Sequence, residues 1–179
     1  MVAPQTCVIG RTPRSWDGLH HYRDGVIRQA TADDAVALLT MERAASGTAL
    51  AHVFGPDLPF PVDDVLARWT LVLADPRTIT LVDEDDGSPV GYAAYGDGWL
   101  HHFGYVPPHW GTGRADLLHT AVLDGLSAQG ARTSYLWVLV DNQRARAFYA
   151  RHGWQDTGVR EREVFRPFPE KMQLHRALD

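Results

Sequence analysis

The stretch YVPPHWGTGRADLL (residues 105–118) decides how the second half of the chain is interpreted. Two prolines and two glycines stand directly ahead of an apolar run, which is typical of a turn that leads into a helix. Glycine at 111 and 113 removes any Cβ, so successive main-chain N–H groups can converge in front of that helix. These N–H groups and the helix dipole favour an anion. The stretch is therefore either a tight connection or a loop that holds phosphate.

Two familiar phosphate-binding motifs do not fit this loop. A Walker A sequence would continue with Gly-Lys-Ser/Thr, and none follows. The dinucleotide-binding fingerprint needs a third glycine where Asp116 stands, and it opens a βαβ unit, whereas the strands ahead of this loop pair as a hairpin.

The residues after the loop predict a helix, a strand and a second helix. Apolar positions between Leu117 and Leu126 recur on one helical face, and Gly130 is placed to end that helix. SYLWVLV (134–140) is a nearly continuous apolar run, typical of a strand buried on both faces. NQRARAFYARHGW (142–154) then predicts a short helix with Asn142 as N-cap and Gly153 as its end.

The remaining segments alternate between helix and strand patterns. Thr31 followed by two aspartates is a helix N-cap signal, and DDGS (85–88) has the composition of a hairpin turn. In chain order, the sequence predicts a strand at 26–30, a helix from 31 to about 45, a loop at 55–61, a helix at 63–73, strands at 78–84, 89–96 and 98–106, and a final hairpin within 154–178 joined at 167–170.

Length and composition are those of one globular domain. The chain has 179 residues, of which 45% are hydrophobic and 22% charged, enough for a single sizeable core. We expect one domain over residues 26–179. Residues 1–25 lack a helical or strand period and predict an N-terminal extension, which could pack across a homodimer.

Charge and cysteine content narrow the class of protein. A formal charge of −5 argues against binding to nucleic acid or to an anionic membrane. Cys7 is the single cysteine, which excludes an intramolecular disulfide, and the histidines lack the spacing of a metal site. No apolar run has the length of a signal peptide core or a membrane span. We expect a cytoplasmic protein without a metal.

Two motifs taken together are more specific than the glycine loop alone. VPPHWGTGRA (106–115), followed by NQRARAFYARHGW (142–154), resembles the coenzyme A-binding half of the GNAT (Gcn5-related) N-acetyltransferases. The family pattern is roughly Arg/Gln-x-x-Gly-x-Gly/Ala, then Asn-x-x-Ala-x-x-x-Tyr-x-x-x-Gly-Phe. The matching residues are Gly113 and Ala115 in the first motif, and Asn142, Ala145, Tyr149 and Gly153 in the second, with Trp154 in place of Phe.

The resemblance implies a fold of the mixed α/β class. Its core would be a mixed, mostly antiparallel sheet of six to seven strands flanked by about four helices. The order would be one strand, two helices, three strands, a helix, a strand, a helix and two strands, which agrees with the segments predicted above.

The resemblance also implies a binding site for acetyl-CoA as cosubstrate. The main-chain N–H groups of residues 111–115 would hold its pyrophosphate, with Arg114 or His109 adding charge. Trp110 stands where the family usually has Arg or Gln. The cofactor-binding residues implied are Tyr105, Val106, Gly111, Thr112, Gly113, Arg114, Ala115 and Asn142.

Catalysis in this family is direct attack of an amine on the thioester. The resemblance implies that Tyr149 donates a proton to the leaving thiolate. A base would accept the amine proton, and strand alternation puts His101 and His102 on opposite faces. The resemblance favours His102, because it lies four residues before Val106, in the parity where several small-amine acetyltransferases of the family carry a glutamate. The ordinary histidine pKa of ~6.5 suits the role. His101 and Glu42 remain alternatives.

The sequence therefore predicts an acetyl-CoA-dependent N-acetyltransferase. Its acceptor would be a primary amine, and the net negative charge favours a small cationic amine. A protein or peptide N-acetyltransferase and a non-catalytic acyl-CoA-binding regulatory module are the alternatives. The acyl group could be acetyl or longer.

Overall fold

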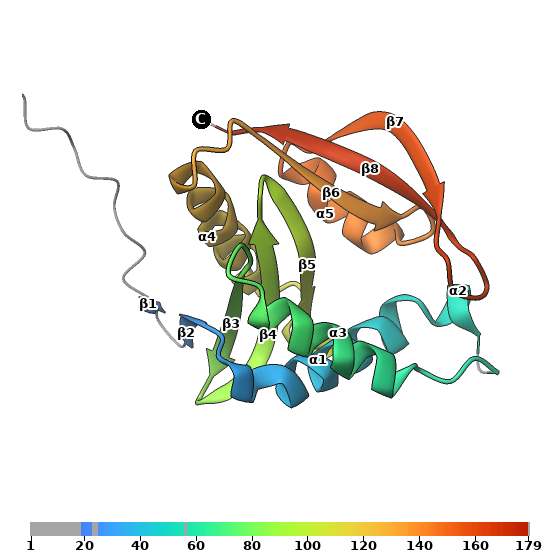
Figure 1. The fold of residues 1–179 in the computed structure, drawn as a ribbon, viewed down its shortest axis with the longest axis horizontal. Coiled ribbons are helices and arrows are strands. Elements are labelled where there is room, and N and C mark those ends of the chain that lie inside the picture. Colours follow the sequence, from blue (N-terminus) through green and yellow to red (C-terminus); the bar gives the residue numbers. More distant parts are fainter. Residues whose placement is uncertain (1–18, 23–24, 56, 179) are drawn as a thin grey trace, which may run out of the picture.

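The computed structural model describes residues 19–22, 25–55 and 57–178 (Figure 1). Its elements in chain order are β1 (Leu19–Tyr22), β2 (Gly25–Gln29), the 3-10 turn η1 (Ala32–Asp34), α1 (Ala35–Ala49), α2 (Ala51–Phe54), α3 (Val62–Ala74), β3 (Ile79–Asp85), β4 (Ser88–Gly96), β5 (Trp99–Tyr105), the 3-10 turn η2 (Pro107–His109), α4 (Arg114–Ala128), β6 (Thr133–Leu139), α5 (Gln143–Arg151), β7 (Gln155–Arg162) and β8 (Glu170–Ala177). Apart from β1 and the short helix α2, which were not predicted, this order confirms the predicted succession of strands and helices.

Within the described residues the strands form one sheet in the order β1-β2-β3-β4-β5-β6-β8-β7. All neighbouring strands are antiparallel except β5 and β6, which are parallel. The parallel pair marks the point where the chain crosses over through α4. The mixed, mostly antiparallel sheet is the one that the sequence predicts.

Helices cover both faces of the sheet (Figure 1). On one face, α1 and α3 pack through Leu38 and Trp69 against Tyr92 of β4. On the other face, α4 packs through Leu118 and Val122 against alternate residues of β3, β4 and β5. Alternation along each strand thus divides the core into two layers.

Local capping chemistry sets the helix ends as predicted. Asp34 accepts a hydrogen bond from the Thr31 main-chain N–H at 2.7 Å ahead of α1. Asn142 Oδ1 accepts from the N–H of Ala145 at 3.1 Å and caps α5. Gly113 and Gly130 flank α4 with φ of 86° and 89°, in the left-handed region that glycine tolerates.

Two expectations differ from the structure. Residues 19–22 fall in the stretch expected to lack a strand, yet they form β1 by pairing with β2. The expectation that β6 is buried on both faces is wrong: Leu136 and Val138 are buried, while Tyr135 and Trp137 alternate with them and are half-buried. Aromatic contact explains the apolar composition of that second face, because Tyr135 stacks on His175 at 6.4 Å between ring centres.

Two further observations concern the whole described chain. No helix in it is both long and apolar enough to span a membrane. Most of the predicted N-terminal extension, with Cys7, lies outside the described residues.

Candidate functional site

A cleft opens where β5 and β6 part. The two strands pair only at Trp99 with Tyr135 and Leu100 with Leu136. Beyond this seam lies a cleft of about 200 Å³. Its walls are formed by Glu42, Tyr92, Leu100, His101, His102, Phe103, Trp137, Val138, Leu139, Asn142, Ala145 and Tyr149.

The glycine loop follows β5 directly and leads into α4. Gly111 and Gly113 have φ of 77° and 86°, and the space beside both Cα atoms is open. Among the described residues, no main-chain acceptor bonds the N–H groups of residues 111–113. Left-handed glycines whose neighbouring N–H groups have no main-chain partner, ahead of a helix, suit an anion such as a pyrophosphate. The loop therefore fits the cosubstrate that the sequence predicts.

Arg114 turns away from this loop and into the core. Its Nη2 lies 3.0 Å from Asp83 Oδ1, its Nε lies 3.1 Å from Asp83 Oδ2, and its Nη1 lies 3.1 Å from Asp85 Oδ1. Nη2 also donates to the carbonyl oxygen of Glu84 at 2.7 Å. The guanidinium is thus bound by the β3 carboxylates and does not face the loop, and a contribution of its charge to a pyrophosphate site stays a prediction.

The side chains of His109 and Tyr105 form hydrogen bonds to the same β3 carboxylates that bind Arg114. His109 Nε2 lies 3.0 Å from Asp85 Oδ2, and this hydrogen bond is the main reason that the pKa of Asp85 is lowered. The Tyr105 hydroxyl donates to Asp83 Oδ2 at 2.7 Å. The side chains of both residues hold the loop against β3, so the charge expected from His109 is also engaged there.

Trp110 lies between the end of β5 and the start of α5. Its Nε1 donates to the carbonyl oxygen of Tyr105 at 2.7 Å, which fixes the indole ring. The guanidinium carbon of Arg144 lies 4.1 Å from the centre of that ring. This is a cation–π contact between the two sequence motifs.

Tyr149 faces the cleft from α5. Only 7% of Tyr149 is exposed to solvent. This burial raises the pKa of its hydroxyl well above the ordinary value. The neighbouring Phe148 instead stacks on Phe103 at 5.4 Å, between α5 and β5. Of the two adjacent rings, Tyr149 is the one that lines the cleft, and its hydroxyl stays protonated.

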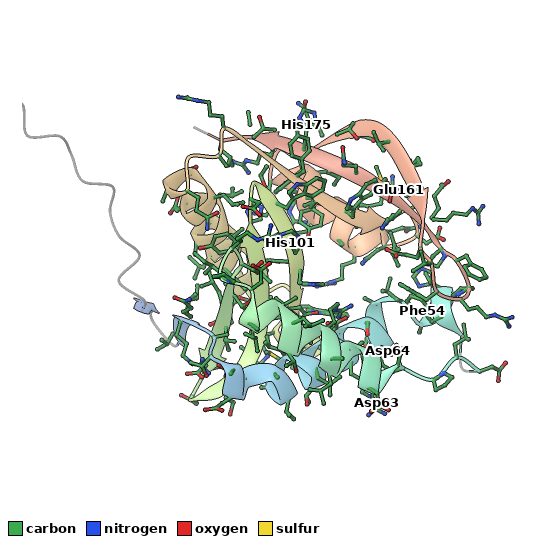
Figure 2. The ribbon with its side chains drawn as sticks, viewed as in Figure 1. Phe54, Asp63, Asp64, His101, Glu161 and His175 are labelled. Carbon is green, nitrogen blue, oxygen red and sulfur yellow. The ribbon has the colours of Figure 1, made fainter. Side chains whose placement is uncertain are left out.

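His101 and His102 both line the cleft, although strict alternation would put them on opposite faces. The register of β4 and β5 shifts between Ala94 and Tyr95, so His101 is an extra residue in its strand. His101, which Figure 2 labels, is exposed by its accessible surface. Partial burial lowers its pKa, an effect that the main chain of Gly96 opposes.

His102 packs on Trp69 of α3, with 4.8 Å between ring centres. Burial, with the nearby positive charge of Arg68, lowers the pKa of His102 to about 3. The ordinary histidine pKa assumed from the sequence is therefore not the one in the fold. The imidazole is neutral at physiological pH and is a weak base.

Glu42 reaches the cleft from α1 and is held there by α3. Its carboxylate accepts hydrogen bonds from Arg68 Nη2 at 2.6 Å and from Trp69 Nε1 at 2.8 Å. Arg68 and Trp69 lie in the segment 63–73, whose helical pattern is visible in the sequence, but no local signal indicates their partner Glu42 on another helix.

Comparison with known proteins identifies the family to which this architecture belongs. The model of the acetyltransferase (GNAT) family matches residues 47–154. The chain belongs to this family. An uncharacterized N-acetyltransferase of Mycobacterium bovis is 37% identical over 99 residues, which cover 52% of this chain. The alignment spans 64% of that relative's length, slightly under two thirds.

Solved structures share the GNAT fold over most of the chain. A GCN5-related N-acetyltransferase from Rhodopseudomonas palustris has a TM-score of 0.73 at 17% identity and covers 89% of this chain and 100% of its own. A spermidine N-acetyltransferase chimera from Vibrio cholerae has a TM-score of 0.65 at 17% identity and covers 87% of this chain and 96% of its own. These likenesses confirm the predicted fold class.

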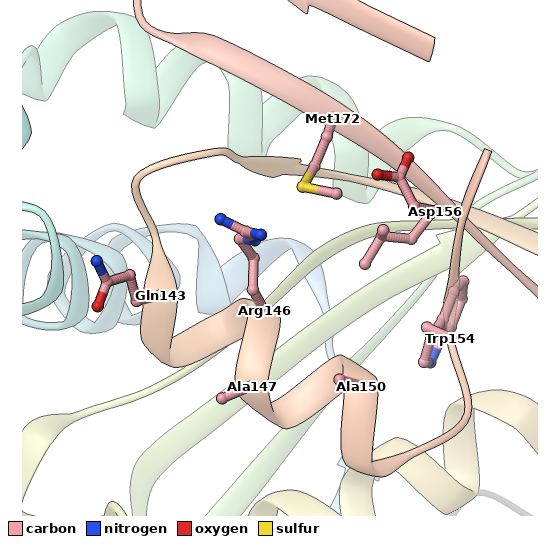
Figure 3. A pocket seen from close by; sticks show the side chains of 8 residues that line it. Gln143, Arg146, Ala147, Ala150, Trp154, Asp156 and Met172 are labelled. Carbon is pink, nitrogen blue, oxygen red and sulfur yellow. The ribbon is translucent and has the colours of Figure 1, made fainter. Parts of the chain in front are cut away.

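A second hollow of the GNAT chain lies between α5 and the β7–β8 hairpin (Figure 3). Its volume is about 520 Å³. Arg146 and Asp156 stand at it, with Ala147 and Met172 among its apolar lining. From α5 it is lined by Arg146, Ala147 and Ala150, whereas Ala145 and Tyr149 of the same helix line the first cleft. The two hollows therefore use different faces of the same short helix.

Metal-binding side chains do not gather in the described part of the chain. Over residues 19–22, 25–55 and 57–178, no three histidine, cysteine, aspartate or glutamate side chains are placed to hold an ion. The side chains available for catalysis in the cleft are those that form its walls.

Proposed function

We propose that this GNAT chain is an acetyl-CoA-dependent N-acetyltransferase that acts on a primary amine by direct transfer. The observation that carries the proposal is the cleft at the β5–β6 seam, with Tyr149 and Asn142 in its wall and the glycine loop at the end of β5. A thioester substrate with its pyrophosphate on the loop would direct its acyl group toward Tyr149. Positioning two substrates in this way supplies a large share of the rate.

The transfer needs one bond to form and one to break. The neutral amine nitrogen attacks the thioester carbonyl carbon, and the carbon–sulfur bond breaks. Tyr149 donates its proton to the departing sulfur, for which its raised pKa keeps the proton available at neutral pH. The amine proton leaves to water or to a nearby base.

We propose that His102 accepts that proton, although it is a weak base. Its pKa of about 3 means that the imidazole is unprotonated at pH 7 and does not retain the proton it receives. The rate should then follow the fraction of amine that is already neutral. The Glu42 carboxylate accepts hydrogen bonds from Arg68 and Trp69. We therefore propose that it contributes a negative charge to the wall of the cleft and is not the base.

The acceptor we propose is a small cationic amine. The Glu42 carboxylate lies in the cleft wall, and the chain has a formal charge of −5. The spermidine enzyme named above has the same fold, which supports an amine of this class. Phe54 of α2, labelled in Figure 2, lies 6.1 Å from Phe165 in the β7–β8 connection, between ring centres. In our proposal these two segments bind the acceptor.

An assay of thiol release with a panel of amines tests the proposal. Polyamines and amino sugars should release free coenzyme A from acetyl-CoA, and acidic amines should not. Saturating acetyl-CoA should also raise the melting temperature, because a ligand at 100 times its Kd stabilises the native state by about 2.7 kcal/mol. Absence of that rise would contradict the proposed function. A rise without release by any amine or peptide would favour a non-catalytic acyl-CoA-binding module.

A further inference from the structure

The cations nearest the glycine loop in sequence do not face a ligand on it. Arg114 is bound by Asp83 and Asp85, and His109 is bound by Asp85. Trp110 occupies the place where the family usually has Arg or Gln. A pyrophosphate on this loop would thus meet main-chain N–H groups but none of the expected positive side chains. Charge-assisted hydrogen bonds are about twice as strong as neutral ones, so the lack of a cation would matter.

Arg144 brings a positive charge to this position from a different element. It is the second residue of α5, and its guanidinium carbon lies 4.1 Å from the centre of the Trp110 ring. The ring is itself fixed by the hydrogen bond to Tyr105, and it precedes Gly111 directly. A planar guanidinium that stacks on an indole keeps its edge N–H donors available for a phosphate.

The local structure of α5 offers no other use for this side chain. Arg144 is exposed, and among the described residues no hydrogen bond or ion pair engages it. It stands in the first turn of α5, which contains no acidic residue. A cation there is opposed by the helix dipole, which favours negative charge at that end. An anion bound between Arg144 and the loop would relieve this repulsion.

We propose that Arg144, held on Trp110, supplies the positive charge that binds the pyrophosphate of the acyl-CoA substrate. In this chain a cation–π pair between the two motifs takes the place of the single Arg or Gln that is usual at position 110. Gly111, Thr112 and Gly113 would bind the pyrophosphate through their N–H groups, and Arg144 through its guanidinium. The inference rests on the proposed function, because it assigns a residue to the same binding site.

Binding measurements with truncated ligands test this assignment without any acceptor. The Kd of coenzyme A, 3′-dephospho-coenzyme A and pantetheine would be measured by calorimetry for the wild type and for Arg144→Gln. Arg146→Gln is the matched control, because it removes the same charge from the same helix on the face that lines the second hollow. Unfolding without ligand would be compared as well, because Arg146 also donates to the Val140 carbonyl oxygen at 2.8 Å, and any change in stability must be separated from a change in binding.

Arg144→Gln should weaken coenzyme A and 3′-dephospho-coenzyme A by about tenfold each, as expected for one lost charge-assisted hydrogen bond. Pantetheine, which lacks the pyrophosphate, should bind as it does to the wild type. Arg146→Gln should bind all three ligands like the wild type. This pattern would support Arg144 as the pyrophosphate cation.

Three results would overturn the assignment. Equal binding of coenzyme A by wild type and Arg144→Gln would remove any role for Arg144. An equal loss in Arg146→Gln would mean a general charge effect, and a loss for coenzyme A but not for its 3′-dephospho form would mean contact with the 3′-phosphate instead. Failure of the wild type to bind coenzyme A at all would contradict the proposed function itself, which distinguishes the two ideas.

Discussion

Arg114 and Asp83 form a two-pronged ion pair that ties the first turn of α4 to β3. The paired atoms lie 3.0 and 3.1 Å apart, and the Asp83 side chain is fully buried. The Tyr105 hydroxyl donates to the same carboxylate. The start of α4, and with it the shape of the glycine loop, thus depends on a charge buried under the loop.

Asp83→Asn should destabilise the fold by about 3 kcal/mol, because removing one partner of a buried pair leaves the other charge poorly compensated. Urea unfolding followed by far-UV circular dichroism would measure the change. Asp156→Asn is the control: its pair with Arg160 is on the surface, so the free energy of unfolding should change little. Equal effects in the two variants would contradict the buried role of Asp83.

Acid should destabilise the fold from an unusually high pH. Burial lowers the pKa of both His102 and His119 to about 3, whereas in the unfolded chain these side chains have the ordinary histidine pKa of about 6.5. Their contribution is therefore complete above pH 6.5 and is lost progressively as the pH falls toward 3.

Between pH ~6 and ~5, where most carboxylates are still ionised, these two histidines should together bind about 1.5 to nearly 2 protons from solvent on unfolding. The slope of the unfolding free energy against pH measures this number. His119→Gln can still accept the hydrogen bond from Trp154 Nε1 and should lower the uptake by about one proton. An unchanged slope in that variant would mean that His119 is not the source.

Tyr149→Phe should lower kcat by about a hundredfold while the Kd for acetyl-CoA stays close to that of the wild type, because only the proton donor is lost. Steady-state thiol release and calorimetry would separate the two effects. Tyr135→Phe, on β6 and stacked on His175, is the matched removal of one hydroxyl outside the cleft. If Tyr149→Phe kept the wild-type kcat, the tyrosine would not be the acid.

The pH dependence of kcat/KM should have no inflection near 6.5, because the pKa of His102 is about 3 and the imidazole is neutral over the whole working range. The profile between pH 6 and 9 should instead rise with ionisation of the amine. His102→Gln should lower the rate but keep the form of the curve. An acidic limb near pH 6.5 that disappears in this variant would show that substrate binding restores an ordinary pKa to His102.

The sequence predicted the elements well where their ends carry local chemistry. Thr31, Asn142 and the glycines at 113, 130 and 153 each mark a helix end that the structure reproduces. Such signals act within a few residues, so they are visible without knowledge of the fold. The family motifs similarly placed Tyr149 on a helix, and that helix faces the cleft.

The parts that could not be predicted depend on distant partners. The inward turn of Arg114 depends on Asp83, which lies 31 residues earlier in the chain. The shared wall position of His101 and His102 depends on a bulge against β4, which alternation alone does not reveal. The contact of Arg144 with Trp110 likewise joins two motifs that are separated by a helix and a strand.

The short seam between β5 and β6 has a consequence for the rigidity of the molecule. Only two residue pairs join the strands there, so the two parts of the sheet share few main-chain hydrogen bonds. A substrate lying in the cleft would bridge them where the backbone does not. Substrate binding would thus connect the two parts of the sheet, and the protein should be more rigid with substrate bound than without it.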